Sequence, residues 1–497
     1  MPVFDILGSK SINDLLSRMI EKLSDQNSTD NMAVRMPHPR RHEDISVRPL
    51  SHSQRRLWFL NKFLPDKTVY NLLLVCHVEG TVDETLLAKT WSVFMQRHEV
   101  LRSRIVDTPD GLQQIPIANA EFSLTVVNSS EDHFLKAVEE LTHIAKNITF
   151  DIEKGEIIRG WLLRSPAEAR FFLASHHLAW DRASVPVIFS ETQAIYKSLL
   201  AKNDPLATLQ PVPYQFIDYS LWEETWLNED ALVKPLIDYW KETLAGIPEA
   251  VSLLPLSLTD KRPAVKQYHV GTVTHALGKP LSMAIKEFCK RKAVTPFMFM
   301  ASTVTALINR LTGDEDVVIG ISDGDRGHSA FDTLVGFTVN MLAIRSQFKP
   351  DMSYDSFLEE YRVACLKAYE HRVLPFDYLI QQLDVPRQTS HSPVFQVTIN
   401  YQVHGSFAES NFDGFKFTKY DHYNAKTQSD FALEIEETSS GELICSWDFD
   451  EALYDTARMS DLAATYQVFV DNIISKNGDA KLDELQLIRN GPGHYRF

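Results

Sequence analysis

The stretch 171–196 constrains the fold of this chain more than any other. It opens with a run of apolar and aromatic residues, 171–175, that is typical of a buried strand. His176 and His177 follow where this strand gives way to a loop, and 184–196 has the apolar spacing of a helix. Neighbouring side chains of a strand point to opposite faces. We therefore expect one imidazole to face a cavity and the other to be held by packing or a backbone hydrogen bond.

Imidazole chemistry gives this pair three possible roles. With an ordinary pKa of about 6.5, a neutral ring can take up a proton at cellular pH and return it. A purely structural role for both rings is the second possibility, and a zinc site is the third. Zinc is disfavoured because side chains of neighbouring strand residues diverge, and no cluster of Cys or His nearby completes a tetrahedral set.

Length and composition narrow the class of protein. A chain of 497 residues predicts two or more domains. Its formal net charge of -16 argues against a nucleic-acid partner. No apolar run approaches the roughly 18 residues that span a membrane, and the N-terminus lacks a secretory signal. Four widely spaced cysteines without a CxxC pair favour buried, reduced thiols in a cytoplasmic protein.

The first 46 residues divide into two parts. Apolar residues within 1–23 fall on one helical face, which predicts an amphipathic helix. The segment 24–46 is polar and contains Pro37 and Pro39, as is typical of a linker.

Several short motifs follow in order along the rest of the chain. Asp83 can cap a helix whose apolar stripe includes Trp91 and Phe94, a turn is expected at 108–111, and 316–321 has the pattern of a buried strand. The motifs with unusual composition lie at residues 50–60, 97–102 (Arg-His-Glu-Val-Leu-Arg), 176–181 (His-His-x-x-x-Asp), 214–222, 238–240, 253–256, 325–327 (Asp-Arg-Gly), 334–342, 371–377 and 390–396. The glycines near residue 325 do not form the Gly-x-x-x-x-Gly-Lys pattern of a phosphate loop.

Taken together, these motifs resemble those of condensation domains in nonribosomal peptide synthetases, whose relatives include chloramphenicol acetyltransferase and plant CoA-dependent acyltransferases. The resemblance implies an α/β fold of two chloramphenicol acetyltransferase-like lobes, arranged as a V-shaped pseudo-dimer around a central tunnel. It implies an N-lobe at 47–212 and a C-lobe at 213–497. On the same basis, residues 1–23 look like the C-terminal helical remnant of an acyl carrier protein. The Asp-Phe-Gly-Trp-Gly motif of the plant enzymes is absent.

The resemblance also implies roles for individual residues. His177 corresponds to the active histidine, where an acyl thioester meets an amine or alcohol. His176 and Asp181 are expected to support it structurally. Asp181 would do so through a buried ion pair with an arginine, with Arg97 as the expected partner and Arg102 as the alternative.

Three further residues are expected at the tunnel, namely Trp180, Arg182 and Asn340. Asn340 would hydrogen-bond the tethered substrate, or alternatively serve at the end of a strand. The family motif ends in glycine where this chain has Arg182. Glycine lets a ligand approach the backbone closely, so a long cation there is expected to narrow the tunnel or to change which nucleophile is accepted.

The form of the motifs is most similar to two groups of fungal megasynthases. These are polyketide synthase–peptide synthetase hybrids and highly reducing polyketide synthases of the lovastatin nonaketide synthase type. The resemblance implies amide formation between an acyl carrier protein as donor and a peptidyl carrier protein as acceptor. It implies no cofactor or metal in the domain, but 4'-phosphopantetheine on the partner carriers. If Arg182 obstructs the acceptor path, the domain would act in docking or product release instead.

Overall fold

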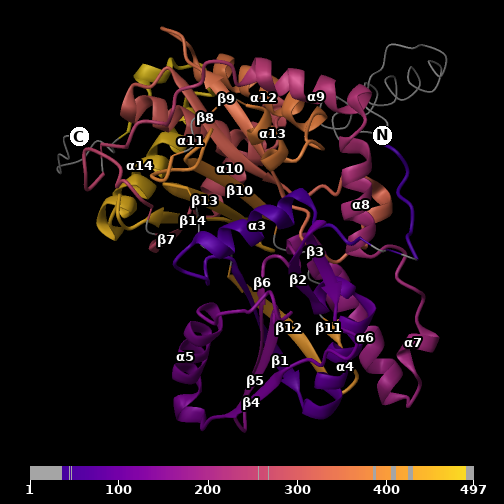
Figure 1. Ribbon diagram of the computed structural model, residues 1–497. Helices are drawn as coiled ribbons and strands as arrows, with labels where there is room; N and C mark the ends of the chain where they lie inside the picture. The colour runs from indigo at the N-terminus through magenta and orange to yellow at the C-terminus, as the bar shows by residue number, and fades with distance from the viewer. Residues whose placement is uncertain are drawn as a thin grey trace.

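The computed structural model describes residues 36–487, except 44, 46, 256, 267, 384, 386–387, 404–409 and 424–428. The helix expected at 1–23 and the first part of the linker lie outside the described residues. The described chain forms two lobes, each built on a six-stranded sheet, so the expected two-lobed α/β architecture is confirmed (Figure 1).

The first lobe is built around a sheet with the strand order β11-β12-β1-β6-β5-β4. Its strands are β1 (Asn71–Gly80), β4 (Leu124–Asn128), β5 (Ile158–Arg164), β6 (Ala169–His176), β11 (Ser410–Asn411) and β12 (Phe415–Tyr423). A separate hairpin consists of β2 (Ser103–Thr108) and β3 (Gly111–Pro116), joined at the predicted turn.

Helices cover both faces of the first sheet. Helix α5 (Phe134–Lys146) packs on one face, where Leu73 and Phe172 belong to its apolar cluster. Helices α4 (Glu84–Arg97) and α6 (Val185–Leu200) pack together in the main core with Leu74 and Phe171 from the opposite face. Because the central strands are apolar on both sides, β6 is a buried strand, as its sequence predicts. Asp83 caps α4 by accepting a hydrogen bond from the Leu86 N–H.

The second lobe is built around a sheet with the order β7-β14-β13-β10-β8-β9. Its strands are β7 (Val270–Ala276), β8 (Asp316–Asp323), β9 (Asn340–Gln347), β10 (Val397–Val403), β13 (Phe431–Glu437) and β14 (Leu443–Asp450). Helices α10 (Lys279–Lys292), α11 (Pro296–Thr312), α12 (Tyr354–Glu370) and α14 (Thr456–Ser475) pack on one side of it.

The remaining helices connect and flank the lobes. Helix α3 lies between the lobes, and α8 runs along one side of the molecule (Figure 1). Their bounds are α3 (His52–Phe63), α7 (Pro205–Thr208), α8 (Phe216–Leu227), α9 (Asp230–Thr243) and α13 (Phe376–Gln382). Short 3-10 helices are η1 (Glu99–Arg102), η2 (Glu131–His133), η3 (Arg182–Ser184), η4 (Ser329–Phe331) and η5 (Leu482–Glu484).

The division at 212/213 does not describe the two sheets. Strand β12, from late in the chain, pairs antiparallel with β1 of the first sheet, from Leu73↔Tyr423 to Gly80↔Phe415. The segment β11–β12 therefore leaves the second lobe and completes the first sheet. A boundary at a single position misses this exchange, because the sequence of a strand shows which of its side chains are buried but not which strand it pairs with.

The described part of the linker is fixed against the second half of the chain. The carbonyl of Pro37 accepts a hydrogen bond from Trp222 Nε1 at 2.6 Å, and Arg41 donates to the carbonyl of Val212 at 2.6 Å. The His42 N–H donates to Asp218 Oδ1 at 2.8 Å. Residues 36–42 thus run along α8 as an ordered strap.

The burial of the four cysteines agrees with the expectation of buried thiols. The four cysteines are free and buried, and burial raises the pKa of Cys289 and Cys445 to about 12. Among the described residues, no helix has both the length and the apolar character needed to cross a bilayer.

Candidate active site

The two histidines occupy the end of β6, and the structure gives them different environments. His176 is fully buried, whereas His177 lines a cavity. This division is the one expected from the alternation of side chains along a strand.

His177 lines the cavity, and the partner of its ring fixes its tautomer. Its backbone N–H donates to the carbonyl of Tyr70 at 2.7 Å, and its Nδ1 lies 3.0 Å from the carbonyl of Trp180. Because a carbonyl oxygen can only accept, Nδ1 carries the proton, and Nε2 keeps its lone pair. The Phe337 ring packs against the imidazole in a T-shaped contact with 4.6 Å between centroids. Burial lowers the pKa of His177, so the ring is neutral at cellular pH.

His176 serves the loop that follows. Its Nδ1 accepts a hydrogen bond from the backbone N–H of Leu178 at 3.2 Å, and Nε2 lies 3.4 Å from the amide of Asn61 in α3. Burial lowers the pKa of His176 to about 3, with a further contribution from His177. Because both of its ring nitrogens have partners within the protein, the buried and neutral His176 supports the end of the strand structurally.

Asp181 anchors the loop from within the core. It is fully buried, and its Oδ2 accepts hydrogen bonds from the N–H and the hydroxyl of Thr338, both at 2.9 Å. Its Oδ1 accepts from the N–H and the hydroxyl of Ser184, both at 3.2 Å, and from Arg326 Nη2 at 3.4 Å. These hydrogen bonds and the ion pair offset the free-energy cost of removing the carboxylate from water. The network ties the histidine loop of the first lobe to the segment before β9 of the second.

The ion-pair partner of Asp181 is Arg326, and the expectation of Arg97 or Arg102 was wrong. Arg97 bonds Glu191 of α6 at 2.9 Å and the carbonyl of Gln210 at 2.9 Å. Arg102 donates to the carbonyl of Ile117 at 2.7 Å and lies near Glu99. Both arginines form their hydrogen bonds and ion pairs within the first lobe, where Arg97 joins α4 to α6. The expectation of a buried ion pair is confirmed, but the cation is Arg326.

Arg326 was visible in the sequence only as part of an Asp-Arg-Gly motif. Its side chain is 4% exposed, and besides Asp181 it bonds the hydroxyl of Ser184 at 3.3 Å and the carbonyls of Phe331 and Leu334. Thr338 belongs to the motif 334–342, which sequence reasoning connected with Asn340 instead. No local pattern tells which of several arginines crosses between lobes, since the pairing depends on tertiary packing.

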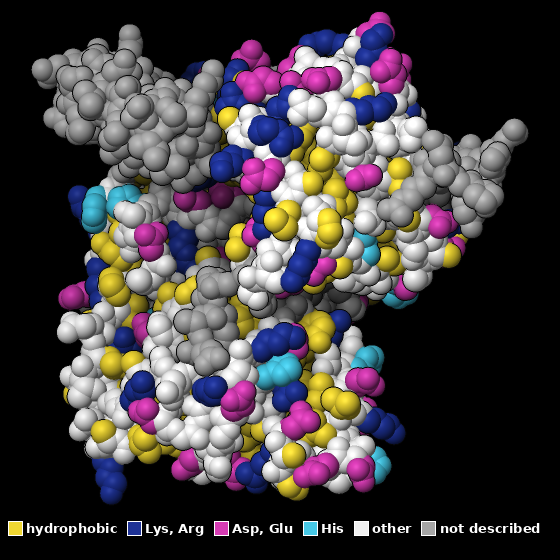
Figure 2. Space-filling model, turned by 180° about the vertical axis from the view of Figure 1, so that it is seen from behind, with side chains coloured by type: hydrophobic (Ala, Val, Ile, Leu, Met, Phe, Trp, Pro, Cys, Tyr) yellow, Lys and Arg dark blue, Asp and Glu magenta, His cyan; other side chains and the backbone are white. Residues whose placement is uncertain are grey.

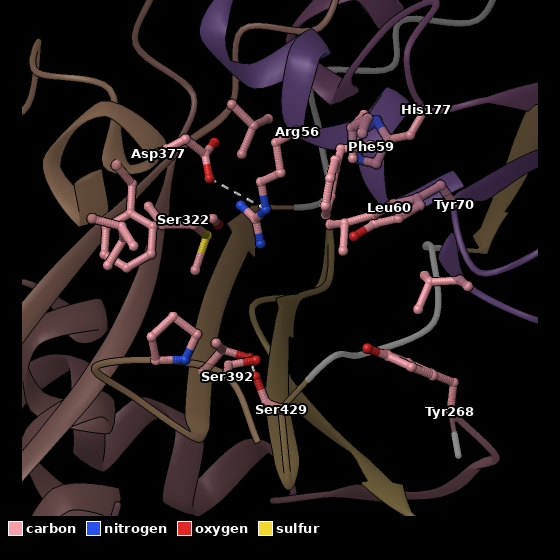
Figure 3. A pocket seen from close by; sticks show the side chains of 18 of the residues that line it. Arg56, Phe59, Leu60, Tyr70, His177, Tyr268, Ser322, Asp377, Ser392 and Ser429 are labelled. Atoms are coloured by element: carbon pink, nitrogen blue, oxygen red, sulfur yellow. Dashed lines mark hydrogen bonds and ion pairs between the residues drawn. The ribbon is translucent and has the colours of Figure 1, made fainter. Parts of the chain in front are cut away.

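The cavity lies at the seam between the lobes and has a volume of about 1020 Å³. Figure 2 shows the surface hollowed between two masses on the back of the molecule. In Figure 3, Arg56, Phe59 and Leu60 of α3, with Tyr70 and His177, line one side, whereas Ser322, Ser392 and Ser429 lie across from them. His177 therefore faces a space that both lobes enclose.

One wall of the cavity is the uncovered face of the second sheet. Along β10, β13 and β14, alternate residues such as Ile399, Leu433 and Trp447 are buried in the core. Most of the cavity-lining residues between them are polar, namely Thr398, Asn400, Gln402, Glu434 and Asp448. This alternation is what a sheet with one covered face and one wet face requires.

An ion pair bridges the cavity near α3. Arg56 Nε lies 3.5 Å from Asp377 Oδ1 of α13 (Figure 3). Burial outweighs the attraction of Arg56 and raises the pKa of Asp377. Both side chains line the cavity and remain partly accessible to water, at 34% and 23% exposure.

The three residues expected at the tunnel have separate outcomes. Arg182, at the start of η3, lines the cavity together with His177. Trp180 is fully buried in the main core and does not line it. Asn340 is engaged elsewhere: its amide donates to the carbonyls of Arg372 and Leu374 at 2.7 and 2.8 Å, and its Oδ1 accepts from the Phe376 N–H at 2.8 Å. These three bonds to the protein hold Asn340 at the start of β9, in agreement with the alternative role at a strand end.

No metal centre is apparent in the described part of the chain, where no group of three His, Cys, Asp or Glu side chains converges. His176 and His177 point to different partners, as described above. The cavity brings the neutral imidazole of His177 beside a polar, partly charged wall.

Comparison with curated proteins finds relatives among large synthetases. The chain is 28% identical over 496 residues to the hybrid PKS-NRPS synthetase pynA of Aspergillus niger, in a match that covers 95% of this chain but 13% of that protein. It is 29% identical over 457 residues to malpinin synthetase of Mortierella alpina, in a match that covers 90% of this chain and 6% of that protein. The chain therefore spans only a small part of the length of these relatives.

Solved structures share the fold at low identity. The condensation domain of the monacolin K polyketide synthase MokA aligns with a TM-score of 0.77 and 21% identity, covering 89% of this chain and 100% of that one. The X-domain in complex with OxyB from teicoplanin biosynthesis aligns with a TM-score of 0.80 and 20% identity, covering 92% and 99%. These matches confirm the predicted two-lobed fold. The family model for the condensation domain matches residues 45–491, and the chain thus belongs to the condensation-domain family.

Proposed function

We propose that this domain transfers an acyl group from a carrier-bound thioester to an amine on a second carrier, within a cytoplasmic fungal polyketide–peptide megasynthase. The observation that carries the proposal is the position of His177, whose unprotonated Nε2 belongs to a ring lining the cavity between the lobes. The similarity to hybrid PKS-NRPS synthetases supports the megasynthase context.

In the proposed reaction, an acyl carrier protein and a peptidyl carrier protein insert 4'-phosphopantetheine arms from opposite sides. The amine attacks the thioester carbonyl, and His177 accepts its proton through Nε2 and returns it to the departing sulfur. The C–N bond of the amide forms as the C–S bond breaks. Orientation of two tethered reactants contributes the larger effect, roughly 7–11 kcal/mol. General-base assistance contributes about 10²–10⁴-fold.

The test is a single-turnover assay with two loaded carriers. One carrier bears the acyl thioester and the other an aminoacyl thioester, and the amide product is followed by intact-protein mass spectrometry. We expect product to form far faster with the native domain than without it. Equal rates with and without the domain would contradict the proposal.

A second candidate function rests on Arg182, which lines the same cavity where the family motif has glycine. On this alternative the guanidinium obstructs the acceptor path, and the domain acts in docking or product release. Arg182→Gly separates the two. A gain of amide formation over the native domain would favour obstruction, whereas an equal or lower rate would exclude it.

A further inference from the structure

The charged side chain of Arg182 lines the cavity. It is half-buried, and among the described residues its guanidinium forms no hydrogen bond or ion pair. It contrasts with Arg56 and Arg326, which have carboxylate partners at 3.5 and 3.4 Å. A guanidinium presents five N–H donors in a planar fork that matches a carboxylate. Within an enclosed space it favours an anionic group of a ligand.

Besides Asp377, which pairs with Arg56, two carboxylates line the cavity with Arg182. Glu434 of β13 accepts a hydrogen bond from Asn400 Nδ2 at 2.6 Å, and Asp448 of β14 accepts one from the Thr272 hydroxyl at 2.6 Å. Because Ala432 pairs with Asp448 and Glu434 pairs with Ser446, the two acids are diagonal neighbours on one face of the sheet. Burial and the charge of Asp448 raise the pKa of Glu434 to about 7, while Arg182 acts in the opposite direction.

The cavity thus holds charges of both signs that act on each other without a direct ion pair. An amine alone would be attracted to Glu434 and repelled by Arg182. A carboxylate alone would be attracted to Arg182 and repelled by the two acids. A ligand that carries both groups satisfies the two sides together.

We propose that Arg182 and Glu434 select an acceptor carrying a carboxylate and an amino group on one small skeleton, with Arg182 binding the carboxylate and Glu434 the ammonium. This proposal rests on the proposed function and specifies its acceptor. Two sources supply this chemistry, namely a free α-amino acid and a carrier-bound amino acid with an acidic side chain.

The acceptor enters as an ammonium and loses one proton to Glu434, which passes it to water. The resulting amine attacks the thioester carbonyl, and its second proton goes through His177 to the thiolate. An amide and a free thiol form from a thioester and an ammonium, with one proton released to solvent.

The test uses octanoyl-pantetheine as donor and compares pairs of acceptors. Glycine is compared with glycinamide, and aspartyl-pantetheine with asparaginyl-pantetheine, since each pair differs in one carboxylate. With the native domain we expect kcat/KM to be at least tenfold higher for the carboxylate member of one pair. A preference in the first pair identifies a free amino acid, and a preference in the second identifies a carrier-bound acidic residue.

Variants assign the preference to the two residues. Arg182→Gln should remove it by raising KM for the carboxylate acceptor, with kcat little changed. Glu434→Gln should raise KM for both members of the pair by a similar factor. Arg291→Gln and Glu139→Gln remove the same charges from α10 and α5, outside the cavity, and should leave the preference intact.

The outcomes are distinct. The inference is overturned if the native domain shows no carboxylate preference, or if the preference survives in Arg182→Gln. Acylation of any acceptor above the uncatalysed rate would still uphold the proposed function. If neither the free nor the pantetheine-bound amines are acylated above the uncatalysed rate, the proposed function fails and the inference fails with it.

Discussion

At the scale of single residues, His176 and His177 show how one strand end separates two roles. The alternation of side chains predicted that one ring would face a cavity, and the structure identifies it as His177. The same rule could not predict the proton on Nδ1 of His177. That proton is fixed by the carbonyl of Trp180, three residues later, which the turn brings within 3.0 Å.

The ion pair of Asp181 and Arg326 gives a prediction for stability. Asp181→Ala should lower the free energy of unfolding by about 3–5 kcal/mol, because it leaves a buried cation without its partner. Arg326→Met should also destabilise, and the double variant should lose less than the sum of the two. Chemical denaturation of the four proteins measures the coupling.

The control for this cycle is Arg97→Met, because Arg97 bonds Glu191 rather than Asp181. Its effect should add to that of Asp181→Ala within about 0.5 kcal/mol. Strong coupling of Asp181 to Arg97, with none to Arg326, would restore the pairing expected from the sequence.

His176 gives a prediction for pH. Its pKa is about 3 in the folded protein, against 6.5 for an ordinary histidine. The unfolded state therefore binds a proton first as the pH falls, and stability drops from pH 6.5 downward, by about 1.4 kcal/mol per unit. His176→Asn keeps an acceptor for the Leu178 N–H but cannot titrate. Denaturant titrations between pH 6.5 and 5.0 should show a shallower slope for the variant, and parallel slopes would refute this assignment.

At the scale of elements, the segment before β9 positions the site by close packing. A Cβ added to Gly336 would lie 1.8 Å from Cδ2 of Phe216 in α8, so this backbone can approach α8 only as glycine. The same glycine bonds the Ser184 hydroxyl through its N–H at 3.2 Å, next to Asp181. The sequence displayed this glycine within a motif, but its contact with a helix more than 100 residues earlier depends on the fold.

Gly336→Ala should therefore destabilise the protein by about 1–3 kcal/mol through overpacking. Thermal unfolding checks this, and Phe216→Leu in the same chain should recover part of the loss by making room. Gly324→Ala is the matched control, because a Cβ there meets nothing within 4 Å. An equal effect of the two glycine substitutions would contradict the steric explanation.

At the scale of the whole molecule, the segment β11–β12 joins the lobes, because it extends from the second lobe into the sheet of the first. Local patterns predicted the strand β6 and the helices α4 and α6, because each depends on periodicity and capping within a few residues. The two-lobed class was implied by the resemblance of the ordered motifs to condensation domains. The addition of β12 to β1 was not predictable in this way, since it pairs residues more than 300 positions apart. The polar wall of the cavity was missed for the same reason.

This exchange predicts cooperative unfolding. Since β12 completes the first sheet and the Asp181 network crosses the seam, we expect each lobe to lose its structure when the other unfolds. Denaturant unfolding followed by probes in each lobe should give coincident transitions. Two separated transitions would show that the lobes are independent.

The central claim concerns the imidazole of His177, and the most direct measurement is the single-turnover rate of amide formation with His177→Ala. Because tethering remains and only proton transfer is lost, the account predicts a fall of about 10²–10⁴-fold with the melting temperature little changed. A variant that condenses at the native rate would contradict the account.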